Sequence, residues 1–134
     1  LVRICDAGDM PFPVWQRHWS QWLRNAAPNR FATMLTPAAG GAACAAWMAE
    51  LEAKGPDRLR VYRVVRLWLV ELGRPGCVRK ACFAYFPRCA QAAGCQRLEV
   101  PLFSLPARLS VLTTAAIAAK LGFASDAAGW SMDL

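Results

Sequence analysis

The feature that most restricts how this 134-residue chain can fold is a group of four cysteines within nineteen residues, Cys77, Cys82, Cys89 and Cys95. Their spacing is C-x4-C-x6-C-x5-C, and Pro87 stands between the second and the third. Because proline interrupts helices, this pattern predicts two short helices joined by a turn. Cys82 would then face Cys89 across the turn, and Cys77 would face Cys95 further down. We therefore expect a cysteine-rich helical hairpin at 77–95.

Three kinds of chemistry fit these thiols: two nested disulfides, buried free thiols, or a zinc site. Four cysteines allow three pairings, and the sequence does not choose among them. Structural zinc sites usually take their ligands from arms with short C-x2-C spacing, which neither arm has here. Buried thiols often pack as small apolar side chains. We interpret the group as a disulfide pair in preference to the other two, and predict no metal and no other cofactor.

Helix start and stop signals recur along the chain. Proline, or serine, threonine or aspartate, precedes apolar segments, and glycine follows them. The segments predicted in this way to be helical are 13–25, 36–55, 57–73 and 106–122, with a last short helix after Ser125 or Asp126. In 57–73 the β-branched content leaves a strand as the alternative. The chain is predicted to be mainly α, a single helical domain over 1–134 built as a small bundle of five or six helices.

One uncharged run, 31–49, has the length of a membrane span. It is mostly alanine and contains Pro37, Gly40 and Gly41. Alanine barely favours lipid. Close approach of another helix to these small residues is therefore the preferred interpretation, and a true span is the alternative.

Two groups of side chains are predicted to contact partners. Trp15, Trp19 and Trp22 recur at i, i+4 and i+7, which places them on one helix face. Four arginines form a basic ridge: Arg58, Arg60, Arg63 and Arg66. Buried aromatic and arginine side chains carry much of the binding energy of interfaces. The alternatives are that the tryptophans form the protein's own core and that the arginines only face water.

Composition argues for a protein that is covered by others. Hydrophobic residues make up 56% of the chain, charged residues 19%, and the net charge is +7. So much apolar surface on a small protein suggests burial against protein partners or a membrane surface. The basic residues are thirteen arginines and three lysines, and arginine suits phosphate and carboxylate partners. The same bias also fits a GC-rich genome.

Catalytic motifs are missing from the sequence. There is no G-x-S-x-G, no H-E-x-x-H, and no Gly-Lys-Ser/Thr after the glycines of AAGGAA. His18 is the single histidine, and a structural role suits it better than a ligand role. The sequence therefore predicts that the protein is not an enzyme.

These observations together predict a non-catalytic accessory subunit of a large, membrane-associated organellar complex, photosynthetic or respiratory, in a plastid or mitochondrion. The chain begins with Leu1, which suggests a processed protein or a piece of a longer one. The alternative is a basic protein associated with nucleic acid, either an organellar ribosomal subunit or a helix-turn-helix DNA-binding protein.

The segment 114–125 resembles the first helix and turn of a helix-turn-helix, with Ala118 at the helix crossing and Gly122 at the turn. The resemblance covers about twenty residues. It implies a recognition helix in SDAAGWSMDL, but that segment is acidic and has no Arg, Lys, Asn or Gln to read bases.

Overall fold

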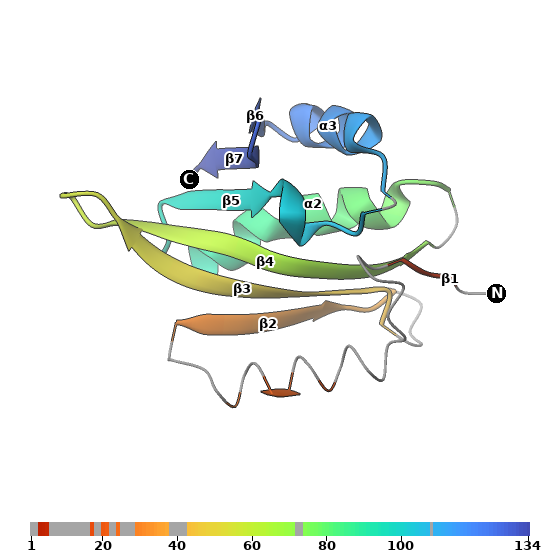
Figure 1. The fold of residues 1–134 in the computed structure, drawn as a ribbon, viewed down its shortest axis with the longest axis horizontal. Coiled ribbons are helices and arrows are strands. Elements are labelled where there is room, and N and C mark those ends of the chain that lie inside the picture. Colours follow the sequence, from red (N-terminus) through yellow and green to blue (C-terminus); the bar gives the residue numbers. More distant parts are fainter. Residues whose placement is uncertain are drawn as a thin grey trace.

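The computed structural model describes residues 3–5, 17, 20, 21, 24, 29–37, 43–71, 74–107 and 109–134. In these residues a mixed sheet of seven strands carries the helices α2 and α3 (Figure 1). The elements are β1 (Arg3–Cys5), β2 (Arg30–Leu35), β3 (Ala45–Lys54), β4 (Leu59–Glu71), α2 (Cys77–Ala92), β5 (Arg97–Pro101), the 3-10 helix η1 (Leu102–Ser104), α3 (Val111–Lys120), β6 (Ala124–Asp126) and β7 (Gly129–Asp133). The prediction of a mainly α bundle of five or six helices is therefore wrong.

The strands lie in the order β2-β3-β4-β5-β7-β6, and β1 also pairs with β4. Neighbouring strands are antiparallel except β4 and β5, which are parallel. A parallel pair needs a crossover connection, and α2 is that crossover. Among the described residues of the segment predicted as the first helix, Arg17, Ser20, Gln21 and Arg24 have helical backbone.

Strands β3 and β4 replace the two helices predicted at 36–55 and 57–73. Gly55, interpreted as a helix stop, lies at the turn between the strands with φ of +72°. The run from Leu67 to Val70 is buried on both sides of the sheet. A strand buried on both faces has a continuous apolar run and no alternation of apolar and polar residues. Its sequence pattern therefore resembles that of a buried helix, and this is why a helix was predicted. No helix in the described residues is long and apolar enough to cross a membrane.

The segment predicted as a helical hairpin is instead continuous helix. Helix α2 runs through Pro87 from Cys77 to Ala92. At 1.5 Å rise per residue, Cys82 and Cys89 lie about 10 Å apart along its axis, and a disulfide needs Cα atoms within about 7 Å. Cys77 and Cys95 stand at opposite ends of the helix. The hairpin and its two bridges are therefore incompatible with this geometry, and all four cysteines are free thiols.

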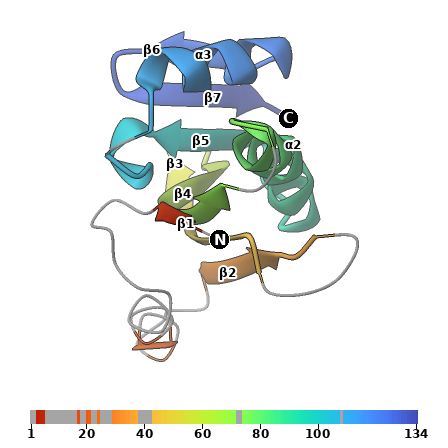
Figure 2. The same cartoon turned by 90° about the vertical axis from the view of Figure 1, so that its right-hand side faces the viewer.

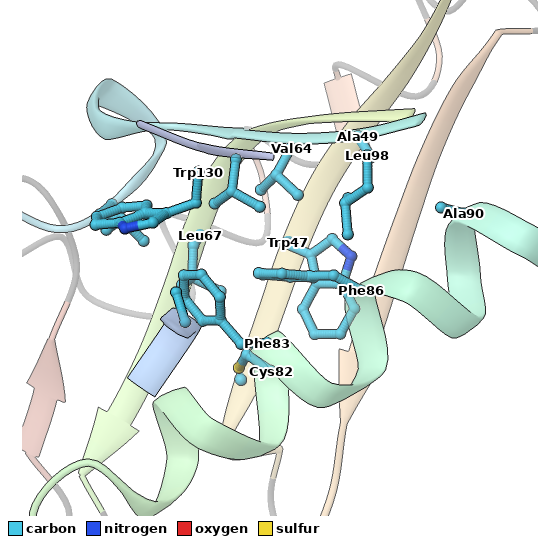
Figure 3. Close-up of a cluster of buried hydrophobic side chains, with 14 of the residues drawn as sticks. Trp47, Ala49, Val64, Leu67, Cys82, Phe83, Phe86, Ala90, Leu98 and Trp130 are labelled. Carbon is cyan, nitrogen blue, oxygen red and sulfur yellow. The ribbon is translucent and has the colours of Figure 1, made fainter. Parts of the chain in front are cut away.

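Helix α2 covers one face of the sheet (Figure 2). An aromatic cluster lies between the helix and the sheet (Figure 3). The Trp47 and Phe86 rings meet edge to face with centroids 4.8 Å apart. Phe83 contacts Phe86 at 5.2 Å and Trp130 at 5.8 Å. Tyr62 supplies the polar contact, because the indole Nε1 of Trp47 donates to its hydroxyl at 3.1 Å. Burial raises the pKa of Tyr62 to about 12.

In the C-terminal segment one predicted helix is present and the helix predicted after it is not. Helix α3 ends at Lys120, and the expected glycine stop, Gly122, follows it with φ of +90°. The N–H of Phe123 donates back to the carbonyl of Ala118 at 3.0 Å. The helix begins later than predicted, capped by Ser110 rather than opened by Pro106. The β6–β7 hairpin follows in place of a recognition helix or a last short helix. The helix-turn-helix resemblance is therefore wrong.

Candidate functional site

The parallel strands β4 and β5 pair over only three residues each. Val61–Arg63 lies against Arg97–Glu99, and the strands then separate. Val65 is an extra residue in the register of β4 against β3, a bulge at the point of separation. Further along the same edge of β4, Leu69 pairs with β1. In the described part of the chain, no strand covers the edge of β4 at positions 64–67.

Five residues separate the end of β4 from the start of helix α2, and this start is basic. Gly76 takes φ of +84° before the first turn, and that turn contains no acidic residue. Arg74 and Lys80 are exposed beside it. The N–H groups at a helix start carry partial positive charge and lack intrahelical acceptors, so this end of α2 favours an anion.

A buried arginine in the same first turn adds to this charge. Arg79 is 6% exposed, and its Nη1 donates to Thr114 Oγ1 at 3.1 Å and to the Ser110 carbonyl at 3.4 Å. Its Nε has no hydrogen-bond acceptor among the described residues. No carboxylate of the described residues forms an ion pair with it. The guanidinium thus lies between the starts of α2 and α3, which gives this region a positive charge that no described side chain neutralises.

A cavity of about 600 Å³ opens where β4 and β5 separate. Strands β3, β4, β5, β6 and β7 contribute its polar residues, and the end of β5 with η1 contributes an apolar part. The lining residues are Lys54, Arg63, Arg97, Glu99, Pro101, Leu102, Phe103, Asp126, Ala128, Gly129, Trp130 and Ser131. Strand alternation places Arg63 and Glu99 on the opposite side of the sheet from Tyr62 and Leu98, which pack in the core. The polar part of the cavity is therefore on the side away from α2.

Glu99 is the centre of a charge cluster in this cavity. Lys54 Nζ lies 2.9 Å from its Oε1, Arg63 Nη2 lies 3.3 Å from the same oxygen, and Arg97 Nε lies 3.3 Å from Oε2. Burial raises the pKa of Glu99, but hydrogen bonds from Lys54, Arg97 and Arg63 and the charge of Lys54 together lower it below its usual range. Glu99 is therefore a charged group that holds three cations in place, and it is a poor general base.

The four arginines predicted as a ridge do not form one. Arg58 lies in the β3–β4 turn with φ of +53°. Arg60 points to the C-terminal end of α2, where its Nη2 donates to the Ala93 carbonyl at 3.4 Å. Arg63 faces the other side and pairs with Glu52 at 2.8 Å, and Arg66 is exposed. A twofold strand period has replaced the helical period on which the ridge depended, and only Arg63 reaches the cavity.

The other sequence-predicted groups do not line the cavity in the part of the chain that the structure describes. Trp15, Trp19 and Trp22 are outside the described residues. Cys77 is exposed at the start of α2, and Cys82 is fully buried in the core. Among the described residues, no group of three or more His, Cys, Asp or Glu side chains is placed to hold a metal.

Comparisons with known proteins give one finding. No family model matches this chain, and no curated protein does. A solved structure described as the crystal structure of a probable acetyltransferase matches with a TM-score of 0.60. The match covers 88% of this chain and 73% of that one, at 13% identity. The chain therefore shares the fold of that structure.

This likeness overturns two expectations. The fold is that of a structure described as an enzyme, so the prediction of a non-catalytic accessory subunit is contradicted, and with it the alternative of a nucleic-acid-associated protein. Neither the fold nor the comparisons support a photosynthetic or organellar role.

Sequence reasoning overlooked most of the residues at this site. Lys54 and Glu99 are 45 positions apart, so only the sheet brings them together. The sequence around Gly76 and Arg79 has a pattern from which an anion site could have been predicted. A long apolar segment, then Gly-Arg-Pro-Gly, then a basic helix start is typical of a strand–loop–helix anion site.

Proposed function

We propose that the protein is an acyltransferase that takes an acyl group from a phosphate-bearing thioester such as acetyl-coenzyme A. The observation that carries the proposal is the uncovered edge of β4 beside its parallel neighbour β5. The description of the solved structure as a probable acetyltransferase supplies the class of reaction.

The residues fit such a donor. At positions 64–67 the backbone groups that point away from β3 have no strand partner among the described residues, and an extended arm with amide groups could bond to them as an added strand would. The donor phosphates suit the start of α2, where Arg74 and Lys80 stand beside the N–H groups of the first turn. The buried charge of Arg79 raises the positive potential there.

The open edge also supplies what the reaction needs. A backbone N–H of this stretch, donating to the thioester carbonyl, would stabilise negative charge on that oxygen during attack. The acceptor nucleophile forms a bond to the acyl carbon, the C–S bond breaks, and the thiol and a proton leave. The cavity on the side away from α2 opens at the same point, which gives the acceptor an approach opposite to the donor.

Calorimetric titration of the full chain with coenzyme A tests the donor site. The double variant Arg74→Glu, Lys80→Glu reverses two charges at the start of α2, and each lost phosphate contact is worth up to about tenfold in affinity. We expect its affinity to fall by about tenfold or more. Lys120→Glu, at the exposed C-terminal end of α3, is the matched control and should bind as the parent does.

Two results would contradict the proposal. One is the absence of measurable coenzyme A binding by the folded parent protein. The other is equal weakening by the α2 and α3 charge reversals, since this would mean that only net charge matters.

A further inference from the structure

We propose that the acceptor is a small molecule with a carboxylate, held by Lys54, Arg63 and Arg97 in the cavity between β4 and β5. The inference rests on the proposed acyltransferase function, because it assigns the second substrate of the same site. It adds the chemical class of that substrate: an apolar, carboxylate-bearing amine of the size of an amino acid.

The charges of the cavity favour an anion at one end. Three cations share one carboxylate, Glu99, at 2.9–3.3 Å. Their other partners, Glu52 and Asp133, are not among the lining residues, and the Asp133 side chain is 85% exposed, so that its pairing with Arg97 is screened by water. The remaining lining carboxylate, Asp126, accepts the N–H groups of Ala128 and Gly129 at the β6–β7 turn.

Donors remain for a second carboxylate. Lys54 Nζ makes two contacts to Glu99, at 2.9 and 3.2 Å, and an ammonium has three protons. Arg97 uses Nε on Glu99 and Nη1 on Asp133, while its Nη2 has no acceptor among the described residues. An incoming carboxylate would form charge-assisted hydrogen bonds with these groups, whereas an ammonium at the same end would meet three cations.

The rest of the cavity suits an apolar body. Pro101, Leu102 and Phe103 line it where β5 ends, and Phe103 is 72% exposed. A cavity of about 600 Å³ holds a small molecule. The size and the mixed lining therefore favour a compact amphiphilic acceptor over a protein chain rich in lysine.

The order of these parts along the cavity places the nucleophile. Arg63 and Glu99 are the last paired positions before the strands separate, and Pro101 to Phe103 follow the separation. A carboxylate bound at the cationic end leaves the other end of the molecule near Leu102 and Phe103 of η1, an element that contacts β4. An amine there lies where the acyl carbon of the donor is proposed to arrive.

The test compares acceptors that differ only in the acid group. Phenylalanine and leucine are each paired with their primary amides, and coenzyme A release from acetyl-coenzyme A is followed by a thiol reagent. We expect the acids to have a KM at least about tenfold below the amides, because each charge-assisted bond is worth up to about one factor of ten. A higher rate with the amides, or preferred acetylation of a lysine-rich peptide, would overturn the proposal.

Variants locate the effect in the cavity. Lys54→Met and Arg97→Gln should each raise KM for the acids by about tenfold and raise KM for the amides much less, so that the preference for the acid falls, while coenzyme A affinity stays intact. Arg88→Gln, on α2 beside Tyr85, is the control and should change none of these values. An equal rise for acids and amides would show that the cations only hold the fold, and would reject the assignment.

Calorimetry with phenylalanine and with its amide, without any donor, is an independent arm that needs no variant. Preferential binding of the acid supports the proposal, and preferential binding of the amide rejects it. Failure of coenzyme A to bind would instead reject the acyltransferase function, so the two failures are distinguishable.

Discussion

At the scale of single residues, the cluster around Glu99 illustrates how burial and charge oppose each other. The Glu99 side chain is 20% exposed, and water alone does not stabilise its charge. Three cations do so, and the pKa of the carboxyl falls below its usual range as a result. Neutralising Glu99 would leave those cations crowded together without their shared partner.

We expect Glu99→Gln to lower the free energy of unfolding at pH 7 by about 1–2 kcal/mol, the size of a part-buried charge-assisted bond. Because the folded pKa is lowered, the contribution of Glu99 is present above its unfolded pKa and is lost as pH falls through the folded value. The difference between parent and variant should therefore shrink below about pH 4. Urea denaturation from pH 3 to pH 7 measures it.

Asp133→Asn is the matched control, since Asp133 is largely exposed, and an exposed ion pair contributes only about 0–1 kcal/mol. A Glu99→Gln deficit that stays constant over the whole pH range would contradict the role given to the charge.

Features of single residues could be predicted from the sequence where they depend on residues close by in the sequence. The Gly122–Phe123 helix stop was found because its hydrogen bonds span only five residues. Arg63 was singled out, but as part of a ridge. Its partners Glu52 and Glu99 stand on other strands, and no local pattern indicates them.

At the scale of elements, the separation of β4 and β5 depends on β7 as well as on the β4 bulge. β5 keeps its pairing with β7 through Pro101, which pairs with Gly129. A Cβ on Gly129 would collide with the Val100 carbonyl oxygen and lie 2.9 Å from Leu102 N. Glycine there allows β7 to approach β5 closely enough to close one wall of the cavity.

Gly129→Ala should therefore destabilise the protein by about 1–3 kcal/mol, through a strained φ of +146° and the backbone collision. Gly55→Ala is the control, since it shares a positive φ but meets nothing within 4 Å. We expect it to cost less, about 1 kcal/mol. Thermal unfolding of both variants compares them, and equal losses would contradict the proposed close approach.

Element types were the weakest part of the sequence prediction, for a physical reason. β3 and β4 lie inside the sheet and are covered on both faces over much of their length, so their hydrophobic residues do not alternate. The proline and glycine residues around these strands mark where an element begins or ends, but they do not distinguish a helix from a strand. The α3 segment, with one buried face, was recognised as a helix.

At the scale of the whole molecule, the apolar excess interpreted as partner contact is partly internal. Trp47, Trp68 and Trp130 are all buried within the chain. A fold in which a sheet packs helices on its surface needs a large core, and its composition then resembles that of a covered subunit. Composition alone therefore did not distinguish the protein's own core from an interface.

Cys82 offers a measure of this core. Its side chain is fully buried, and burial raises the pKa of its thiol well above the usual range. We expect Cys77 to react with a thiol reagent in the native state within minutes and Cys82 to react only on global unfolding. Mass spectrometry of labelled peptides over time in low denaturant separates the two. Equal labelling rates would contradict the described packing.

The uncovered stretch of β4 also bears on solubility. An exposed strand edge normally invites pairing with another chain and so promotes aggregation. Here β5 pairs with residues 61–63 and β1 with residues 69–71, so only five positions of β4 lie between them. A strand from a second protein molecule could pair with no more than these five residues, the length of one short strand. The sheet can thus offer backbone groups to a narrow ligand while limiting how far another chain can pair with it.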